Sequence, residues 1–86
     1  MSSKRGIPLN SEAIFGQILK SIRKKQKVSQ EELAFRSNLD RTYISMLERG
    51  IHQPTLNSLL AIAAALDMKA ADLVGFVEDE MGRYQN

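Results

Sequence analysis

The chain has 86 residues, of which 43% are hydrophobic and 26% charged, and it contains no cysteine. This length allows one small domain with a single core, and the composition is globular rather than disordered. Without cysteine there are no disulfides or thiolate metal sites, and no apolar run is long enough for a signal peptide or a membrane span. We therefore expect a soluble, cytoplasmic protein.

Charge is distributed unevenly along the chain. Residues 1–53 carry ten Lys or Arg against five Asp or Glu, a net charge of +5, whereas residues 54–86 carry two against five, a net charge of −3. Such asymmetry favours a basic face that meets a polyanion. A solvated helix surface can produce the same pattern by chance.

Hydrophobic spacing predicts five helices and no strands. The first begins after a cap at Asn10 or Ser11 and ends near Gln26. Its apolar stripe consists of Ile14, Ile18, Leu19 and Ile22.

The second helix has a strong start signal. Ser29 and Glu32 are spaced as a capping box, and Val28 before the cap can pack on Leu33. The helix is expected to end at residues 37–38, because Asn38 tolerates the left-handed backbone that ends helices.

Three further helices follow. The third runs from a cap at Asp40 to about residue 49 and stops at Gly50. The fourth starts after a cap at Thr55, and the fifth runs from residue 70 or 71 to about Met81. The side of the fourth predicted to be apolar carries Leu56, Leu59, Leu60, Ala63 and Leu66. We thus expect an all-α domain over residues 10–81, with a flexible arm at 1–9 and a tail at 82–86.

The second and third predicted helices fit a helix-turn-helix. Ala34 is small enough for the helices to cross closely, Asn38 occupies the turn, and Ile44 and Leu47 anchor the third helix to the core. The remaining face of the third helix is then free to enter a DNA major groove. That face carries Arg41, Thr42, Tyr43, Ser45 and Met46.

These residue types suit base reading. Arginine can bind guanine through two hydrogen bonds, threonine can bond a base or touch a thymine methyl, and methionine offers an apolar contact. Gln30, in the first turn of the second helix, can bond a phosphate. A first-turn Arg41 and Thr42 would be merely solvated on an arbitrary helix, but the surrounding spacing favours a recognition helix.

The stretch "SQEELAFRSNLDRTYISMLERG" resembles the Xre/Cro-type helix-turn-helix of phage repressors, and "SNLDRTYISMLERG" is most similar to the controller proteins of restriction-modification systems. The resemblance implies a compact five-helix, lambda-repressor-like domain that dimerises on partly symmetric operators. It also implies that Gln30 contacts phosphate, that Tyr43 contacts the DNA backbone, and that Arg23 and Glu48 form a buried ion pair. The base-facing positions it implies are Arg41, Thr42, Ser45 and Met46.

Two departures from the family pattern stand out. Asn38 replaces the commoner turn glycine, and the loop 51–54 lacks the cation found in many relatives. Backbone contacts are therefore assigned to other polar residues: Arg49, His52, Gln53 and Asn57, with Lys4 and Arg5 of the arm. Glu31 either favours the helix dipole or, as in some similar phage activators, contacts the polymerase sigma subunit.

The fifth helix carries more apolar surface than an isolated domain of this size buries, which predicts a homodimer. The predicted interface consists of Val74, Phe76, Val77 and Met81. The alternative is that these residues complete the monomer core.

We interpret the chain as a dimeric transcriptional regulator of its own promoter and of a restriction-modification operon. The alternative is an antitoxin-like protein that also masks a protein partner. The residues available for catalysis exclude an enzyme, since there is one histidine, no phosphate-binding loop and no metal-ligand spacing. We expect no cofactor and no metal.

Overall fold

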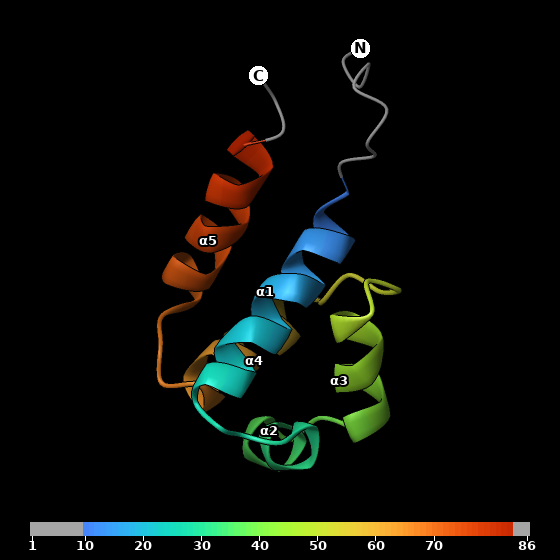
Figure 1. Cartoon of the computed structure of the whole chain (residues 1–86). Helices are drawn as coiled ribbons and strands as arrows, with labels where there is room; N and C mark the ends of the chain where they lie inside the picture. Colours follow the sequence, from blue (N-terminus) through green and yellow to red (C-terminus); the bar gives the residue numbers. More distant parts are fainter. Residues whose placement is uncertain (1–9, 84–86) are drawn as a thin grey trace.

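The computed structural model describes residues 10–83, which form five helices and, within that range, no strand (Figure 1). The predicted all-α, five-helix domain is confirmed. The arm 1–9, with Lys4 and Arg5, and residues 84–86 lie outside the described residues. The helices are α1 (Ser11–Lys25), α2 (Gln30–Ser37), α3 (Arg41–Glu48), α4 (Leu56–Ala65) and α5 (Ala70–Arg83).

Side-chain caps begin three of the helices. Asn10 accepts a hydrogen bond from the N–H of Ala13 at 2.7 Å, and Ser29 accepts one from Glu32 at 3.0 Å. Thr55 does the same at the start of α4. Each cap satisfies a backbone donor that has no partner inside its helix.

Two of the predicted caps differ in detail. Asp40 occupies the cap position of α3 but makes no side-chain hydrogen bond to it. Only one of the two capping-box hydrogen bonds forms, the one to the Ser29 side chain. The carboxylate of Glu32 instead accepts bonds from Arg36, one turn later, at 3.0 and 3.2 Å. The start of α3 therefore depends more on tertiary packing than the sequence pattern indicates.

The first four helices end in the same way. After each, one residue adopts a left-handed backbone, and its N–H and that of the next residue bond carbonyls of the last turn. These residues are Lys27, Asn38, Gly50 and Asp67, with φ of 61°, 58°, 74° and 59°. The predicted ends at Asn38 and Gly50 are confirmed, and the tight reversals keep consecutive helices close together.

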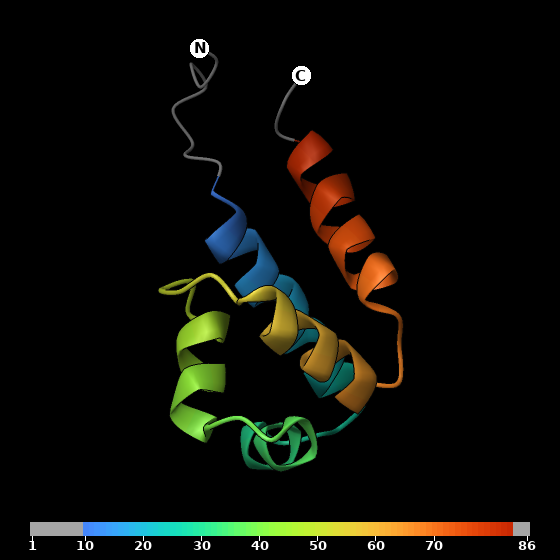
Figure 2. The same ribbon diagram turned by 180° about the vertical axis from the view of Figure 1, so that it is seen from behind.

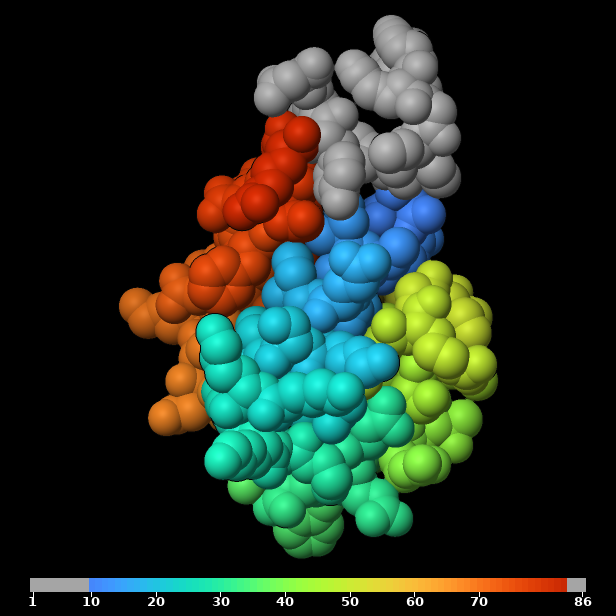
Figure 3. Space-filling model, viewed as in Figure 1, coloured from blue at the N-terminus to red at the C-terminus, as the bar shows by residue number. Residues whose placement is uncertain are grey.

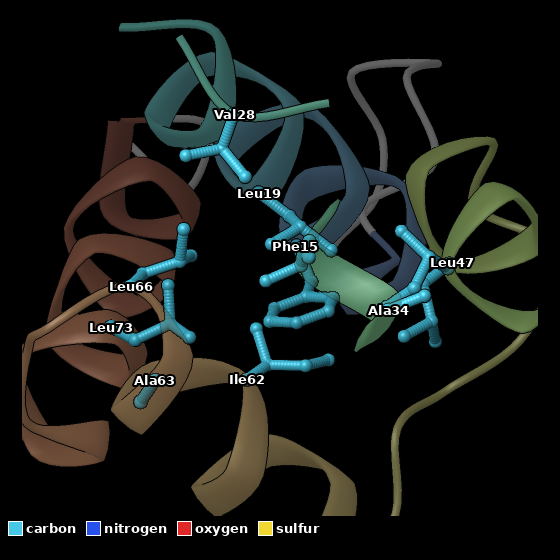
Figure 4. Packing of buried hydrophobic residues seen from close by; sticks show 11 residues of the cluster. Phe15, Leu19, Val28, Ala34, Leu47, Ile62, Ala63, Leu66 and Leu73 are labelled. Carbon is cyan, nitrogen blue, oxygen red and sulfur yellow. The ribbon is translucent and has the colours of Figure 1, made fainter. Parts of the chain in front are cut away.

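All five helices contribute to one core (Figure 4). Its fully buried large side chains are Leu19, Leu33, Ile44, Leu47, Ile62, Leu66 and Leu73. The inner face of α4 is rotated from the predicted one, so that Ile62 faces the core while Leu56 and Leu60 are 70% and 50% exposed.

The packing of α1 against α3 depends on Gly16. A Cβ at this position would lie 2.4 Å from the carbonyl oxygen of Leu47 and 2.7 Å from that of Glu48. Only glycine allows so close an approach of the two backbones. The contact fixes which side of α1 faces α3.

The helices place α3 and α5 on opposite sides of the molecule, with α1 and α4 between them (Figures 1 and 2). The fifth helix extends to Arg83, two residues beyond its predicted end at Met81. Gly82 and Arg83 thus belong to the helix and not to a tail.

Candidate nucleic-acid interface

The helix-turn-helix is built as its pattern predicts. Ala34 is 6% exposed where α2 meets the core, Asn38 and Leu39 form the turn, and Ile44 and Leu47 of α3 are fully buried. Because these buried residues fix the rotation of α3, its opposite face must point to solvent.

That outer face of α3 is polar. Thr42, in the first turn, and Arg49, at the C-terminal cap, are exposed on this face, and Ser45 and Met46 between them are partly exposed. Arg41 is exposed on one edge, near α1 and α2, where it shares a shallow depression with Gln30. The helix therefore presents side chains that can bond the edges of bases.

Tyr43 lies on the other edge of α3. It is partly buried and packs against the core, and it lines a hollow with the turn residues and with Thr55 and Ser58 at the start of α4. Asn57, in the first turn of α4, is exposed. This edge could meet DNA backbone through the Tyr43 hydroxyl and the amino end of α4.

A buried hydrogen-bond network supports the edge of α3 that carries Arg41. The Arg23 guanidinium donates to both carboxylate oxygens of Glu48, at 2.6 and 3.0 Å, and to the carbonyl of Val28 at 2.9 Å. The expected Arg23–Glu48 ion pair is therefore present. The hydrogen bond to Glu48 raises the pKa of Arg23, burial opposes that rise, and the charge of Glu48 adds to it.

The network also includes Gln30. Its amide nitrogen donates to an oxygen of Glu48 at 3.0 Å, so the carboxylate that neutralises Arg23 also fixes the Gln30 side chain. Among residues 10–83, the second N–H of this amide and the amide oxygen make no side-chain hydrogen bond. Sequence reasoning missed this bond, because Gln30 and Glu48 lie 18 positions apart and no local pattern joins them.

The remaining residues predicted to contact DNA follow α3 and differ in their surroundings. Arg49 and His52 are exposed. Gln53 is exposed too, but its amide donates to the hydroxyl of Ser11 at 2.8 Å, and it lies beside Val74 of α5. A DNA contact by Gln53 stays a prediction, and its side chain already has a structural partner.

The four residues predicted to form a dimer interface do not share one face of α5. Val77 packs against the core, and with Val74 it lines an apolar depression next to Leu59. Phe76 lies on the other flank, in a groove formed with α1. Val74 and Phe76 remain 40% and 48% exposed.

Sequence reasoning also missed the exposed surface of α2. Phe35 is 86% exposed, one turn after Glu31, on the side of α2 opposite Leu33 and Ala34. The signal was available, since an aromatic residue outside the buried spacing of a helix has no place in the core.

In fold and exposed chemistry, this is a helix-turn-helix protein with a face suited to DNA. A family model described as helix-turn-helix matches residues 19–73. The chain is 43% identical to the control protein C.BamHI of Bacillus amyloliquefaciens over 68 residues, which are 78% of this chain and 84% of that protein. It is 36% identical to the immunity repressor of Bacillus phage phi105 over 74 residues, but spans only 51% of that repressor.

Solved structures agree with these similarities. The restriction-modification controller protein C.AhdI of Aeromonas hydrophila superposes with a TM-score of 0.69 at 43% identity, covering 71% of this chain and 92% of that one. The controller protein C.Esp1396I gives a TM-score of 0.76 at 32% identity, covering 86% and 95%. A point mutant of C.Esp1396I bound to its operator site OM gives 0.78 at 31% identity, covering 86% and 97%.

The chain therefore belongs to the helix-turn-helix family, and its similarity to the Xre-type controller proteins is confirmed. It is a DNA-binding transcription regulator and not an enzyme. Among the helices of residues 10–83, none combines the length and the apolar composition that a membrane span requires.

Proposed function

We propose that the protein acts in the cytoplasm as a homodimer, binds a partly symmetric operator, and controls its own promoter within a restriction-modification operon. The proposal rests on the polar outer face of α3, which the buried Ile44 and Leu47 orient toward solvent and which Gln30 borders on one edge. Several relatives that this chain covers almost fully are restriction-modification controllers, one of them bound to an operator.

In this mechanism α3 reads bases in the major groove. Arg41 and Thr42, in its first turn, reach furthest toward base edges, with Ser45 and Met46 beside them. Gln30 and Tyr43, on the two edges, bond phosphates of the two strands and set the register. A two-fold axis would place two copies of α3 about one DNA turn, ~34 Å, apart.

The proposed dimer surface is the flank of α5 that faces α4. Val74 on this flank adjoins Leu59 across the apolar depression, and Leu56 and Leu60 lie next to Leu59 around α4. Exposed leucines and a valine grouped in this way favour burial by a second copy. Phe76, on the opposite flank, is then not part of the same interface.

Changing Val74 to aspartate tests this surface. A charge placed in an apolar interface loses its hydration without gaining a partner, so we expect Val74→Asp to be monomeric in sedimentation equilibrium and to bind an operator at least tenfold more weakly. Phe76→Asp is the matched control on the same helix and should remain dimeric. A dimeric Val74→Asp, or a monomeric Phe76→Asp, would contradict the assignment of the interface.

The same measurement addresses the antitoxin-like alternative. An antitoxin would use the apolar surface of α5 for a different protein. In that case the purified chain would remain monomeric, and its operator affinity would not depend on Val74.

We also propose that Glu31 contacts the sigma subunit of RNA polymerase when the protein activates transcription. Glu31 is exposed in the first turn of α2, and the adjacent Phe35 supplies apolar surface that packing among residues 10–83 leaves uncovered. An acid beside an exposed aromatic residue suits a basic protein segment better than it suits DNA phosphates.

If Glu31 makes this contact, its loss should reduce transcription activation without weakening operator binding. Glu31→Ala should leave operator affinity within about twofold and reduce activated transcription several-fold in a purified polymerase assay. Glu32→Ala is the control, because Glu32 is already paired with Arg36. Equal loss in both variants, or no loss in either, would refute the contact.

A further inference from the structure

The exposed lysines of α1 have no role in the interface described so far. Lys20 and Lys24 on the helix and Lys27 in the turn after it are exposed. None of the three ion pairs found in residues 10–83 includes them. We call these three residues the lysine flank.

The packing of α1 shows where this flank lies. Gly16 and Arg23 face α3, the first against its backbone and the second through Glu48. Lys20 lies between them along the helix, one turn after Gly16, and Lys24 lies one turn further on. Both lysines therefore border the α3 side of α1, next to the edge that carries Arg41.

Lys27 continues the flank toward α2. It is two residues before the Ser29 cap and directly before Val28, whose carbonyl accepts a bond from Arg23. Lys27 also has a left-handed backbone, a conformation that is strained for a non-glycine residue.

The surface between the flank and α3 is suited to an anion. In Figure 3 the outer surface of α1 continues into that of α2 and meets α3 along one edge. Arg23 contributes no net charge, because Glu48 neutralises it, and Glu31 is the acidic side chain in the depression beside Gln30 and Arg41. The three lysines outweigh that single acid.

We propose that the lysine flank binds DNA phosphates outside the base pairs that α3 reads. This inference rests on the proposed function and extends its footprint along the strand that Gln30 contacts. The flank adds affinity and salt dependence but no sequence preference, because phosphates are the same in every sequence.

The test compares salt dependence on the preferred duplex. Removal of one lysine–phosphate pair should make the slope of log K against log salt shallower by about 0.9. Because a homodimer carries each lysine twice, Lys20→Gln/Lys24→Gln/Lys27→Gln should therefore reduce the slope by roughly 5, with the preferred sequence unchanged. All three residues are exposed, so circular dichroism should show an unchanged fold.

Lys25→Gln is the matched control. Lys25 is adjacent to Lys24 but about 100° further around α1, toward the side where Ile18 and Ile22 meet α5. This variant should keep the wild-type slope. A reduction of about 1.8 for Lys25→Gln, two pairs per homodimer, would mean that any surface cation has this effect, and would overturn the inference.

Duplex length gives the second readout. On a duplex trimmed to the base pairs read by α3, the triple variant and the wild type should have the same slope. The outcomes are separable: wild-type protein that selects no sequence overturns the proposed function together with this inference. Specific binding by the wild type with an unchanged slope in the triple variant overturns the lysine flank alone.

Discussion

Replacing Glu48 by alanine should destabilise the fold by about 3–5 kcal/mol, the largest effect expected of a single substitution at the ion pair. Arg23 is 8% exposed, and its charge is balanced by the carboxylate of Glu48 at 2.6 Å. Without that carboxylate a buried guanidinium has only the carbonyl of Val28 as a partner. Urea unfolding at fixed protein concentration measures the loss. A loss below about 1 kcal/mol, the range of a solvated surface pair, would contradict the buried arrangement.

A double substitution separates stability from binding. Arg23→Met/Glu48→Leu replaces both charges with apolar side chains, and such replacements are commonly neutral or stabilising. The double variant should therefore recover most of the stability that Glu48→Ala loses. It should still bind an operator more weakly than wild type, because Gln30 has lost the oxygen that holds its amide. Full recovery of both properties would show that Glu48 does not position Gln30.

Arg41→Ala should weaken specific DNA binding by about 1–3 kcal/mol and relax the preference at one base step. Arg41 is exposed in the first turn of α3, and a guanidinium there can bond two acceptors of a guanine. Binding measured on a panel of duplexes with single base changes gives both quantities. Uniform weakening on every duplex would instead make Arg41 a phosphate contact.

Gln30→Ala is the companion measurement for Arg41→Ala. Loss of a phosphate-contacting residue should weaken binding to all duplexes by a similar factor and leave the preferred bases unchanged. A changed base preference in Gln30→Ala would refute its assignment to the backbone.

Most of the fold could be predicted from local signals in the sequence. The caps at Asn10, Ser29 and Thr55 and the left-handed Asn38 and Gly50 act within a few residues, so the helix boundaries they set agree with the structure. The identity of the recognition helix followed because its buried positions leave only one outward face.

The features that the sequence did not determine depend on how a helix is rotated about its axis and on contacts between residues far apart in the chain. The fourth helix is apolar almost all round, so its periodicity did not decide between Leu60 and Ile62 for the core. Val74 and Phe76 are both apolar and two residues apart, which puts them on different flanks about 200° apart. The bond from Gln30 to Glu48 joins two helices and has no local signature.

Operator recognition by a dimer is best tested by selection of duplexes from a random DNA pool at near-physiological salt, followed by affinity measurements as salt is raised. We predict enrichment of an inverted repeat with half-sites about one DNA turn apart, and affinity that falls steeply with salt. A folded protein that enriches no sequence would contradict this prediction, and would leave the helix-turn-helix without the operator that its outer face is proposed to read.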